Sequence, residues 1–219
     1  MKIKWVIKIG GSLFSKHAVR LCVNLVGKDV LVICGGGALA NLLRGYDTEM
    51  NFSDSAAHKS AILCMDILGM LLADKVPNAN MVYSFNQAQK VLYDNRLPIF
   101  IPSQFLGEND SLEHSWRVTS DSLSLYIAHQ LKAKLLIATD VDGIYDQLPS
   151  EDGAQLISHI SAKKLLDFGE TSVDEFLANL LLQYKSSCYV VNGKYPERVL
   201  SIIEGERDKD NKYTLIGGN

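Results

Sequence analysis

Short, almost wholly apolar runs alternate with longer segments of helical periodicity along most of this chain. The apolar runs are typical of strands buried on both faces of a parallel sheet. They are the N-terminal stretch up to Ile9, Val30–Cys34, Met81–Phe85, Ile99–Ile101, Leu135–Ala138, Cys188–Val191 and Thr214–Ile216. Helices are predicted at Leu13–Val26, from Ala38, and at Asp54–Lys75, Asn86–Asp94, Ser122–Leu131, Ser161–Phe168, Val173–Tyr184 and Pro196–Glu204. The alternation predicts an α/β fold, closed by a charged turn at Glu206–Lys212 and a last edge strand at Thr214–Ile216.

The longest predicted helix, Asp54–Lys75, is apolar on more than one side. Ser53 is a favourable N-cap, and Asp54 suits the positive end of the helix dipole. A helix that is hydrophobic nearly all round is buried on several sides, so we expect part of it to form a subunit interface. His58, one turn from the helix start, is either a capping or surface histidine or a contact to an acceptor phosphate at the mouth of a cleft.

Two predicted strands end in glycine loops that open predicted helices. Lys8 lies almost at the tip of the first strand, before Gly10-Gly11-Ser12, and Gly35-Gly36-Gly37 follows the second strand. Glycine lets the backbone approach a ligand closely, and the free N–H groups of a helix start favour an anion. The two loops therefore predict a phosphate site. A dinucleotide fold would place its glycine motif after the first strand with an acid about 20 residues later, and the P-loop pattern is absent.

Acidic residues mark two later strand-to-helix regions. Asp121 opens the predicted helix Ser122–Leu131, with Thr119 or Ser120 as its cap, and it is either a first-turn acid that favours the helix dipole or a functional carboxylate. The loop Thr139–Asp146 holds three aspartates around Gly143. Its glycine falls at the fourth position rather than the sixth, which excludes an EF-hand calcium loop. At the carboxyl edge of a sheet, such a loop predicts contacts to a nucleotide.

Composition narrows the class of protein. The chain has 219 residues, of which 47% are hydrophobic, and its formal net charge is −3. This net charge gives no basic surface for binding nucleic acid. No uncharged apolar stretch reaches the roughly 18 residues of a membrane span. We therefore expect neither a nucleic acid nor a membrane as partner, and we expect a cytoplasmic protein. The four scattered cysteines, Cys22, Cys34, Cys64 and Cys188, are expected to be reduced, and mostly buried, thiols.

Taken together, these stretches resemble the amino acid kinase superfamily, which includes acetylglutamate, uridylate and isopentenyl phosphate kinases. The matching motifs, in order, are Lys8–Ser12, Gly35–Gly37, Thr119–Ser122 and Thr139–Tyr145. Within the superfamily, Ala57–Asp66 and Tyr189–Arg198 are similar to the kinase branch of methanofuran biosynthesis. That branch phosphorylates an aminomethyl-furanylmethyl phosphate to its diphosphate.

The resemblance implies a three-layer αβα sandwich around a mainly parallel sheet. Residues 1–115 would form an acceptor-binding lobe and residues 116–219 a nucleotide-binding lobe within one structural domain. It also implies ATP and Mg2+ as cofactors, a small phosphate-bearing acceptor and a homo-oligomer. Lys8 and Asp121 would be catalytic; Gly10, Gly11, Ser12, Gly36 and Gly37 would bind phosphate; Gly35, Asp54, His58 and Thr119 would bind the acceptor. Thr139, Asp140, Asp142, Gly143, Ile144, Tyr145 and Asp146 would bind the nucleotide; the metal ligands stay open.

One departure from the family pattern affects the mechanism. Many members carry a second catalytic lysine after a Gly-Gly-Met turn, whereas the corresponding region here, Phe168–Asp174, has no lysine. Lys163, Lys164 or Mg2+ are candidates for the missing charge. The departure also leaves a second hypothesis open: a storage or sensor protein that binds nucleotide on the same fold without kinase turnover. Kinases for isopentenyl phosphate, UMP or an amino acid are further alternatives.

Overall fold

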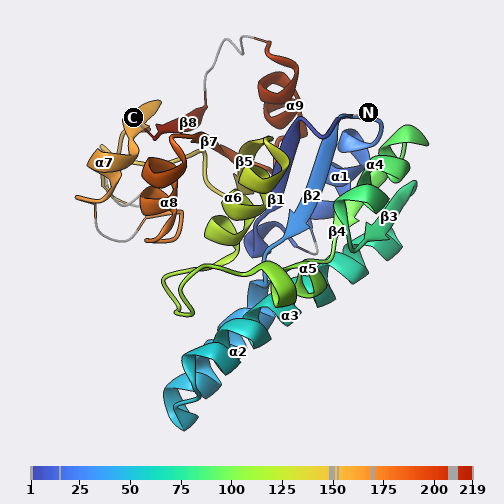
Figure 1. Ribbon diagram of the computed structural model, residues 1–219. Coiled ribbons are helices and arrows are strands. Elements are labelled where there is room, and N and C mark those ends of the chain that lie inside the picture. Colours follow the sequence, from blue (N-terminus) through green and yellow to red (C-terminus); the bar gives the residue numbers. More distant parts are fainter. Residues whose placement is uncertain are drawn as a thin grey trace.

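The computed structural model describes residues 2–14, 16–147, 151, 153–168, 171–206 and 212–218. Its centre is a single eight-stranded sheet with the strand order β3-β4-β2-β1-β5-β7-β8-β6 (Figure 1). The strands are β1 (Trp5–Ile9), β2 (Val30–Cys34), β3 (Ala79–Val82), β4 (Leu97–Phe100), β5 (Lys134–Thr139), β6 (His159–Ser161), β7 (Ser187–Asn192) and β8 (Tyr213–Gly217). The six strands from β3 to β7 in this order are parallel, and β8 runs antiparallel to β7. The predicted α/β fold with a mainly parallel sheet is confirmed.

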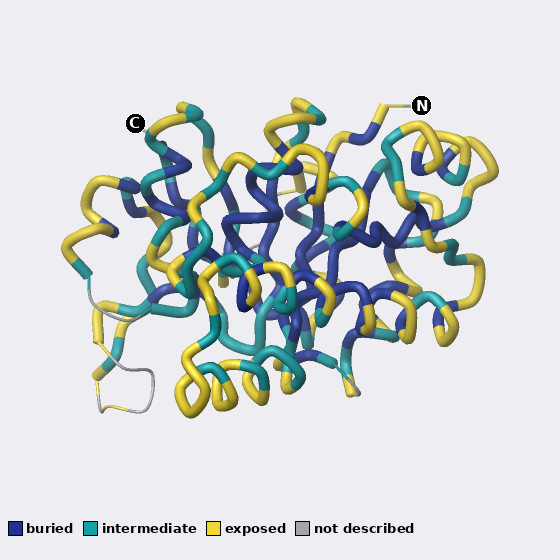
Figure 2. The backbone as a smooth tube through the Cα atoms, turned by 60° about the horizontal axis from the view of Figure 1, so that its bottom comes forward, coloured by how far each residue is buried: buried dark blue, intermediate teal, exposed yellow. Residues whose placement is uncertain are grey.

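Helices connect these strands and cover both faces of the sheet. In chain order they are η1 (Gly11–Leu13), α1 (Ala18–Leu25), α2 (Gly37–Met50), α3 (Asp54–Lys75), α4 (Phe85–Tyr93), α5 (Ser103–Asn109), α6 (Ser120–Leu131), α7 (Ala162–Leu165), α8 (Leu177–Tyr184) and α9 (Pro196–Glu204). Two apolar clusters, one on each face, form the core: α6, α7 and α8 contribute to one, and α1, α9 and the second half of α3 to the other. Figure 2 shows the buried strands enclosed by helices with exposed outer faces. The result is the predicted three-layer arrangement.

Strand β1 lies between β2 and β5 and decides where the lysine at its tip points. Successive side chains of a strand face opposite sides of the sheet, so Trp5, Ile7 and Ile9 pack with α1 and α9, whereas Val6 belongs to the cluster on the α6 face. Lys8 shares the face of Val6. The pairing of β1 with β5 also makes the sheet continuous across the expected boundary at residue 115, and the division into two functional lobes remains a prediction.

Local sequence signals located several elements accurately. Ser53 caps α3 by accepting a hydrogen bond from the backbone N–H of Ala56, and α3 and α9 have the predicted bounds. The α2–α3 hairpin projects beyond the sheet (Figure 1). By length and apolarity α3 passes the test for a membrane-spanning helix, yet 44% of that stretch is buried inside the fold. Core helices pass the same test, so this helix is better explained by packing.

Other expectations need correction. The helix predicted at Leu13–Val26 begins only at Ala18, because Gly11–Leu13 forms a 3-10 turn first. The strand predicted at Met81–Phe85 is shifted to 79–82, since Ser84 caps α4 through the backbone N–H of Gln87. The helices predicted at 161–168 and 173–184 shrink to α7 and α8. The terminal strand β8 is internal rather than an edge, because the unpredicted strand β6 pairs beside it. Residues 207–211 of the charged turn lie outside the described residues.

The cysteines are free, as expected. Cys22, Cys34 and Cys188 are buried, and Cys64 is partly exposed. Burial raises the pKa of Cys34 to about 12, so this thiol stays protonated and inert at neutral pH.

Candidate functional site

The two glycine loops touch one another at the carboxyl edge of the sheet. A Cβ atom on Gly11 would lie 2.2 Å from the Cα atom of Gly37, so the contact leaves no room for a side chain at Gly11. Gly37 also has a φ of +55°, a left-handed conformation that favours glycine. The loops are held to the sheet by the hydrogen bonds from Gly10 N–H to the carbonyl of Ala138 and from Gly35 N–H to the carbonyl of Ile9, both 2.8 Å. The predicted two-loop cradle is therefore formed by close backbone packing.

Lys8 and Asp121 form a buried ion pair beneath this cradle. The Lys8 Nζ lies 2.6 Å from Asp121 Oδ1, and the two side chains are 10% and 6% exposed. Gly35 lies directly beside the pair, because a Cβ atom there would be 3.3 Å from Lys8 Cε. The explanation of Asp121 as a mere first-turn acid does not account for this contact. A buried charge needs a partner, and each of these residues supplies the other's.

Asp174 organises the start of α6 from a distant part of the chain. Its carboxylate accepts hydrogen bonds from the N–H and hydroxyl of Thr119, from the N–H and hydroxyl of Ser122 and from the N–H of Leu177. Burial and the neighbouring charge of Asp121 raise the pKa of Asp174. Thr119 occupies the N-cap position but makes no side-chain capping bond. The cap predicted from Thr119 or Ser120 is thus supplied by Asp174, which in turn fixes Asp121 against Lys8.

A cavity of about 480 Å³ opens beside the glycine cradle. Among the predicted site residues it brings together Gly11, Ser12, Gly36, Gly37, His58 and Thr119. The rest of its lining comes mainly from α2, α3 and the segment before α6, with Met65, Trp116 and Leu123 as the larger apolar side chains. No carboxylate is among the described lining residues, whereas Arg44 and His58 are. We call this space the acceptor cavity, after the ligand that the family resemblance predicts for Thr119 and His58 in its wall. Asp54 lines a much smaller pocket next to it, which shares His58 and Trp116.

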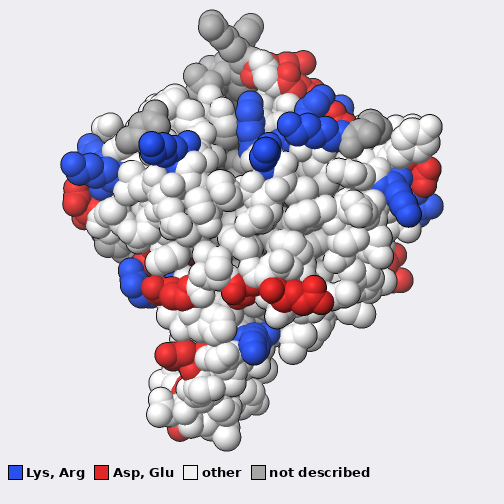
Figure 3. Space-filling view, in the orientation of Figure 1, with Lys and Arg blue, Asp and Glu red and all other residues white. Residues whose placement is uncertain are grey.

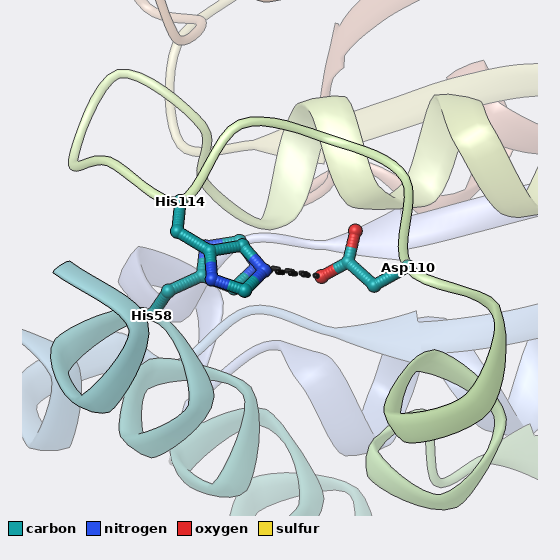
Figure 4. Close-up of side chains that lie close together, drawn as sticks. All are labelled: His58, Asp110 and His114. Atoms are coloured by element: carbon teal, nitrogen blue, oxygen red, sulfur yellow. Dashed lines mark hydrogen bonds and ion pairs between the residues drawn. The ribbon is translucent and has the colours of Figure 1, made fainter.

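His58, Asp110 and His114 form a cluster behind the wall of the acceptor cavity (Figure 4). His58 Nε2 lies 2.8 Å from Asp110 Oδ2, His114 Nε2 lies 3.7 Å from the same oxygen, and His114 Nδ1 lies 3.1 Å from the hydroxyl of Ser55. We call these three residues the histidine latch, because they tie the segment after α5 to the start of α3. His58 is only 5% exposed, which rules out the surface alternative for this residue.

The histidine latch has the donor types of a metal site but not its geometry. Its three ligand atoms lie within 4.8 Å of one another. A metal ion requires the lone pairs of both imidazoles to converge on one point about 2.0–2.1 Å from each nitrogen. The two rings are instead stacked, with centroids 4.4 Å apart and planes inclined by 12°, so their lone pairs run side by side. We therefore interpret the cluster as a hydrogen-bonded tether.

Trp116 provides a second tether across the acceptor cavity. Its indole N–H donates to Asp47 Oδ2 on α2 over 2.6 Å, and the guanidinium of Arg44 lies 4.7 Å above its ring centre. Beyond Arg44 and Trp116 a wider cleft of about 930 Å³ begins, lined also by Arg117, Phe168 and residues 171–175. Gly169 and Glu170, within the region where the family's second lysine is missing, lie outside the described residues. The described residues on either side, Phe168 and 171–174, line this cleft, which shares Arg44, Trp116 and Thr119 with the acceptor cavity.

The predicted nucleotide loop, 139–146, emerges from β5 beside the end of β7. Asp142 Oδ1 accepts from Arg198 at 2.8 Å and from the Asn192 amide at 2.9 Å. Lys194 Nζ reaches the carbonyl of Asp140 and lies 3.9 Å from its carboxylate. The loop is therefore braced by residues from the end of β7 and the start of α9.

The other members of this loop differ in what they can offer a ligand. Ile144 is buried and its N–H donates to the Thr214 hydroxyl, and a Cβ atom on Gly143 would collide with that hydroxyl. Burial raises the pKa of the partly exposed Tyr145, and the charge of Asp142 adds to the rise. Thr139 and Asp140 are partly exposed, and Asp146 is exposed. Thr139, Asp140 and Tyr145 are therefore accessible to a ligand, whereas Gly143 and Ile144 anchor the loop.

Several residues of the site were missed from the sequence. These residues contact predicted site residues or line the same cavities: Asp174, Arg44, Asp110, His114, Trp116, Asn192, Lys194 and Arg198. Asp47 belongs with them because it holds Trp116. Their signals in the sequence were weak, since each acts through a partner far along the chain. The resemblance over Tyr189–Arg198 was the only pointer to three of them.

Comparisons with known proteins agree with this architecture. Residues 4–192 match the Amino acid kinase family. The chain is 42% identical to the [5-(aminomethyl)furan-3-yl]methyl phosphate kinase of Methanocaldococcus jannaschii, covering 97% of each chain, and 28% identical to a uridylate kinase of the same organism, covering 82% and 80%. The crystal structure of uridylate kinase from Archaeoglobus fulgidus superposes with a TM-score of 0.73 at 23% identity, over 98% of this chain and 100% of that one. The last similarity shows a shared fold.

Proposed function

The chain belongs to the amino acid kinase family, and we propose that this kinase transfers the γ-phosphoryl group of ATP to a small acceptor that already carries a phosphate. The observation that carries the proposal is the acceptor cavity itself. Its described lining combines the two glycine loops with Arg44 and His58 and contains no carboxylate, and the buried Lys8–Asp121 pair lies next to Gly35 of the second loop. Backbone N–H groups and cations in this arrangement favour a bound anion.

The acceptor we propose is an aminomethyl-furanylmethyl phosphate, which would become its diphosphate. This proposal is supported by the 42% identity to a kinase named for that substrate over almost the whole chain. The cavity volume of about 480 Å³ suits a small molecule. Met65, Leu123 and Trp116 offer apolar contacts to a ring, and the glycine loops offer N–H groups to a phosphate. His58 and Thr119 complete the wall on which the acceptor would lie.

The reaction needs charge stabilisation more than acid–base chemistry. A phosphate monoester has its second pKa at about 6 and is mostly a dianion at pH 7, so its oxygen attacks without a general base. The transition state spreads charge over the equatorial oxygens of the transferred group. In this proposal Lys8, held by Asp121, and the N–H groups of the glycine loops that are not bonded to the sheet stabilise that charge. Asp174 keeps Asp121 in position.

The nucleotide would lie along the 139–146 loop, with Mg2+ bound to its phosphates. The carboxylates near the cradle are already engaged: Asp121 by Lys8, Asp142 by Arg198 and Asn192, and Asp174 by backbone and hydroxyl donors. Mg2+ commonly binds through substrate phosphates, waters and one or two carboxylates. The donor set therefore fits an ion held chiefly by ATP, with Asp140 the described carboxylate most available to it. The ion would neutralise charge on the nucleotide phosphates.

We also propose that the protein is a cytoplasmic homo-oligomer. Leu63, Ile67, Met70 and Leu71 form an apolar stripe on one side of α3, and each is about half exposed. Residues spaced by four, seven and eight positions share one helix face. Glutamate at Leu63 and Ile67 together is expected to shift the protein toward monomer in light scattering. If the molar mass of the double variant in solution equals that of the wild type, the stripe is not the subunit interface.

The test of the kinase proposal is acceptor-dependent formation of ADP. Purified protein with MgATP should be offered a furanylmethyl phosphate with an aminomethyl group, isopentenyl phosphate, UMP and acidic amino acids, one at a time. We expect turnover with the first and far less with the others. ATP binding by calorimetry without turnover on any acceptor would instead favour the storage or sensor alternative.

Lys8→Met tests the chemistry at the centre of the site. The variant leaves Asp121 without its cation, and we expect kcat to fall by several orders of magnitude, as expected when transition-state charge loses its main partner. Circular dichroism and nucleotide binding should show that the fold survives. Turnover close to that of the wild type would remove Lys8 from the mechanism.

A further inference from the structure

Most lysine and arginine side chains near the proposed site of phosphoryl transfer are already paired with carboxylates, so little positive charge is left for the transferred group. Lys8 is paired with Asp121, Lys194 lies near Asp140, and Arg198 is paired with Asp142. Arg117, which lines the second cleft, pairs with Glu113 and Glu175. Among the described residues, Arg44 lines the cavities without a carboxylate partner.

Arg44 also lies where both spaces meet. It lines the acceptor cavity together with Gly11 and Gly37, and it lines the adjoining cleft together with residues 171–175. Those residues belong to the region where many family members carry a second lysine and this chain does not. Trp116 and Thr119 are shared by the two spaces as well, so the junction is a continuous surface from the glycine loops to that region.

The helix geometry directs Arg44 toward the glycine loop. Gly37, Ala40, Asn41 and Arg44 have the spacing of one helix face and all line the acceptor cavity. Long side chains on a helix point back toward its N-terminus. This preference would extend the Arg44 side chain toward the end of α2 that forms the cradle, and its guanidinium lies 4.7 Å from the centre of the Trp116 ring, which limits its freedom. The indole is itself fixed by the hydrogen bond to Asp47.

The alternatives named from the sequence are less well placed. Lys163 and Lys164 lie on α7, and both are exposed. Neither lines the acceptor cavity or the adjoining cleft. Arg117 lines only the cleft, and its charge is shared between two glutamates.

We propose that Arg44 contacts the phosphoryl group in transit and supplies the second positive charge that the family's lysine provides elsewhere. The inference rests on the proposed kinase function. An oxygen of the acceptor phosphate forms a bond to the γ-phosphorus while the bond from that phosphorus to the β,γ-bridging oxygen breaks. ADP leaves with the electron pair, and no proton has to move. Arg44 remains a cation throughout and binds the equatorial oxygens through its fork of N–H donors.

The first experiment compares Arg44→Gln with Arg117→Gln in steady-state kinetics. We expect Arg44→Gln to lower kcat by about 10²- to 10³-fold, the range seen when one donor to a developing charge is removed. Arg44→Lys should recover part of this loss, and Arg117→Gln should stay within about threefold of the wild type. Guanidinium ion should raise the rate of Arg44→Ala, whereas the same concentration of sodium chloride should not. A purely structural role would not produce such chemical rescue.

The second experiment is independent of turnover. Calorimetry with inorganic pyrophosphate should show roughly tenfold weaker binding to Arg44→Gln than to the wild type or to Arg117→Gln. If the wild type proves to have no kinase activity, the kinase proposal fails, and this measurement still tests Arg44 as a phosphate ligand. Equal pyrophosphate affinity in Arg44→Gln and the wild type would overturn the inference, as would a kcat of Arg44→Gln within threefold of the wild type.

Discussion

The acceptor cavity and the predicted nucleotide loop are built in different ways. On one side, the acceptor cavity is enclosed by the two glycine loops, whose backbones are in contact and cannot separate easily. On the other sides it is closed by the histidine latch and by Trp116, which is hydrogen-bonded to Asp47. The nucleotide loop lies open at the edge of β5 and β7, and its shape depends on charged side chains, chiefly Asp142 with Arg198. One site is shaped by close packing and the other by ion pairs.

This difference indicates how each half would respond to change. A close-packed cradle tolerates little displacement, because a shift of about 1 Å can cost about 100-fold in rate. Partly exposed ion pairs contribute little free energy singly, so the open loop should tolerate substitution with smaller effects. Figure 3 shows the projecting α2–α3 hairpin as mostly uncharged surface, below a row of acidic side chains.

Among the substitutions that test this comparison, the largest effect is expected when the contact between the glycine loops is broken. In Gly11→Ala the new Cβ would meet the Gly37 backbone, so the loops must separate. We expect kcat to fall by about 100-fold, measured by ADP formation. Gly45→Ala is the matched control, because Gly45 lies on the same helix as Gly37 with open space around it. It should retain activity and gain about 0.5–1 kcal/mol of stability.

A smaller effect is expected at the nucleotide loop. Asp142→Asn removes the charge that holds Arg198 and weakens the bond from Asn192. We expect the KM for ATP to rise by up to about tenfold, an effect of about 1.4 kcal/mol, while kcat and the acceptor KM change little. If kcat fell as far as in Gly11→Ala, the distinction between the acceptor cavity and the predicted nucleotide loop would be contradicted.

The smallest effect on activity, and a specific effect of pH on stability, is expected at the histidine latch. Burial alone would raise the pKa of Asp110, but the hydrogen bond from His58 and the two histidines together lower it. A lowered carboxyl pKa stabilises the fold at neutral pH, and that stabilisation is lost as pH falls through the lowered value, below about pH 4. Asp110→Asn should cost about 1.5–3 kcal/mol at pH 7.

The measurement for Asp110 is urea unfolding of wild type and Asp110→Asn at pH 7 and pH 3. The difference between the two proteins should shrink at pH 3, where the wild-type carboxyl is also becoming protonated. A difference that stays constant between these pH values would show that the carboxylate charge does not contribute.

The sequence predicted the elements whose signals are local. Ser53 and the apolar run behind it defined α3, Pro196 defined the start of α9, and strand-terminal glycines located the cradle. The pairing of Lys8 with Asp121 followed from the family resemblance, and the geometry supports it because β1 and α6 share one face of the sheet.

What the sequence did not predict depends on contacts between distant residues. Asp174 caps α6 from more than 50 positions away, so no local pattern reveals it. Strand β6 is only three residues long and gains its place by pairing with β8. His58 reads locally as a residue in the first turns of a helix, and its burial results from Asp110 and His114 closing over it. Tertiary partners decided each of these cases.

Trp116 gives the acceptor cavity an optical reporter. The chain has two tryptophans, and the other, Trp5, is buried against Tyr189 on the opposite face of the sheet. Replacing Trp5 with phenylalanine would leave Trp116 as the one tryptophan. Its indole is hydrogen-bonded to Asp47, and the guanidinium of Arg44 lies over its ring. Emission from that single ring should change when a ligand enters the cavity, so that binding can be followed in real time without labelling either partner.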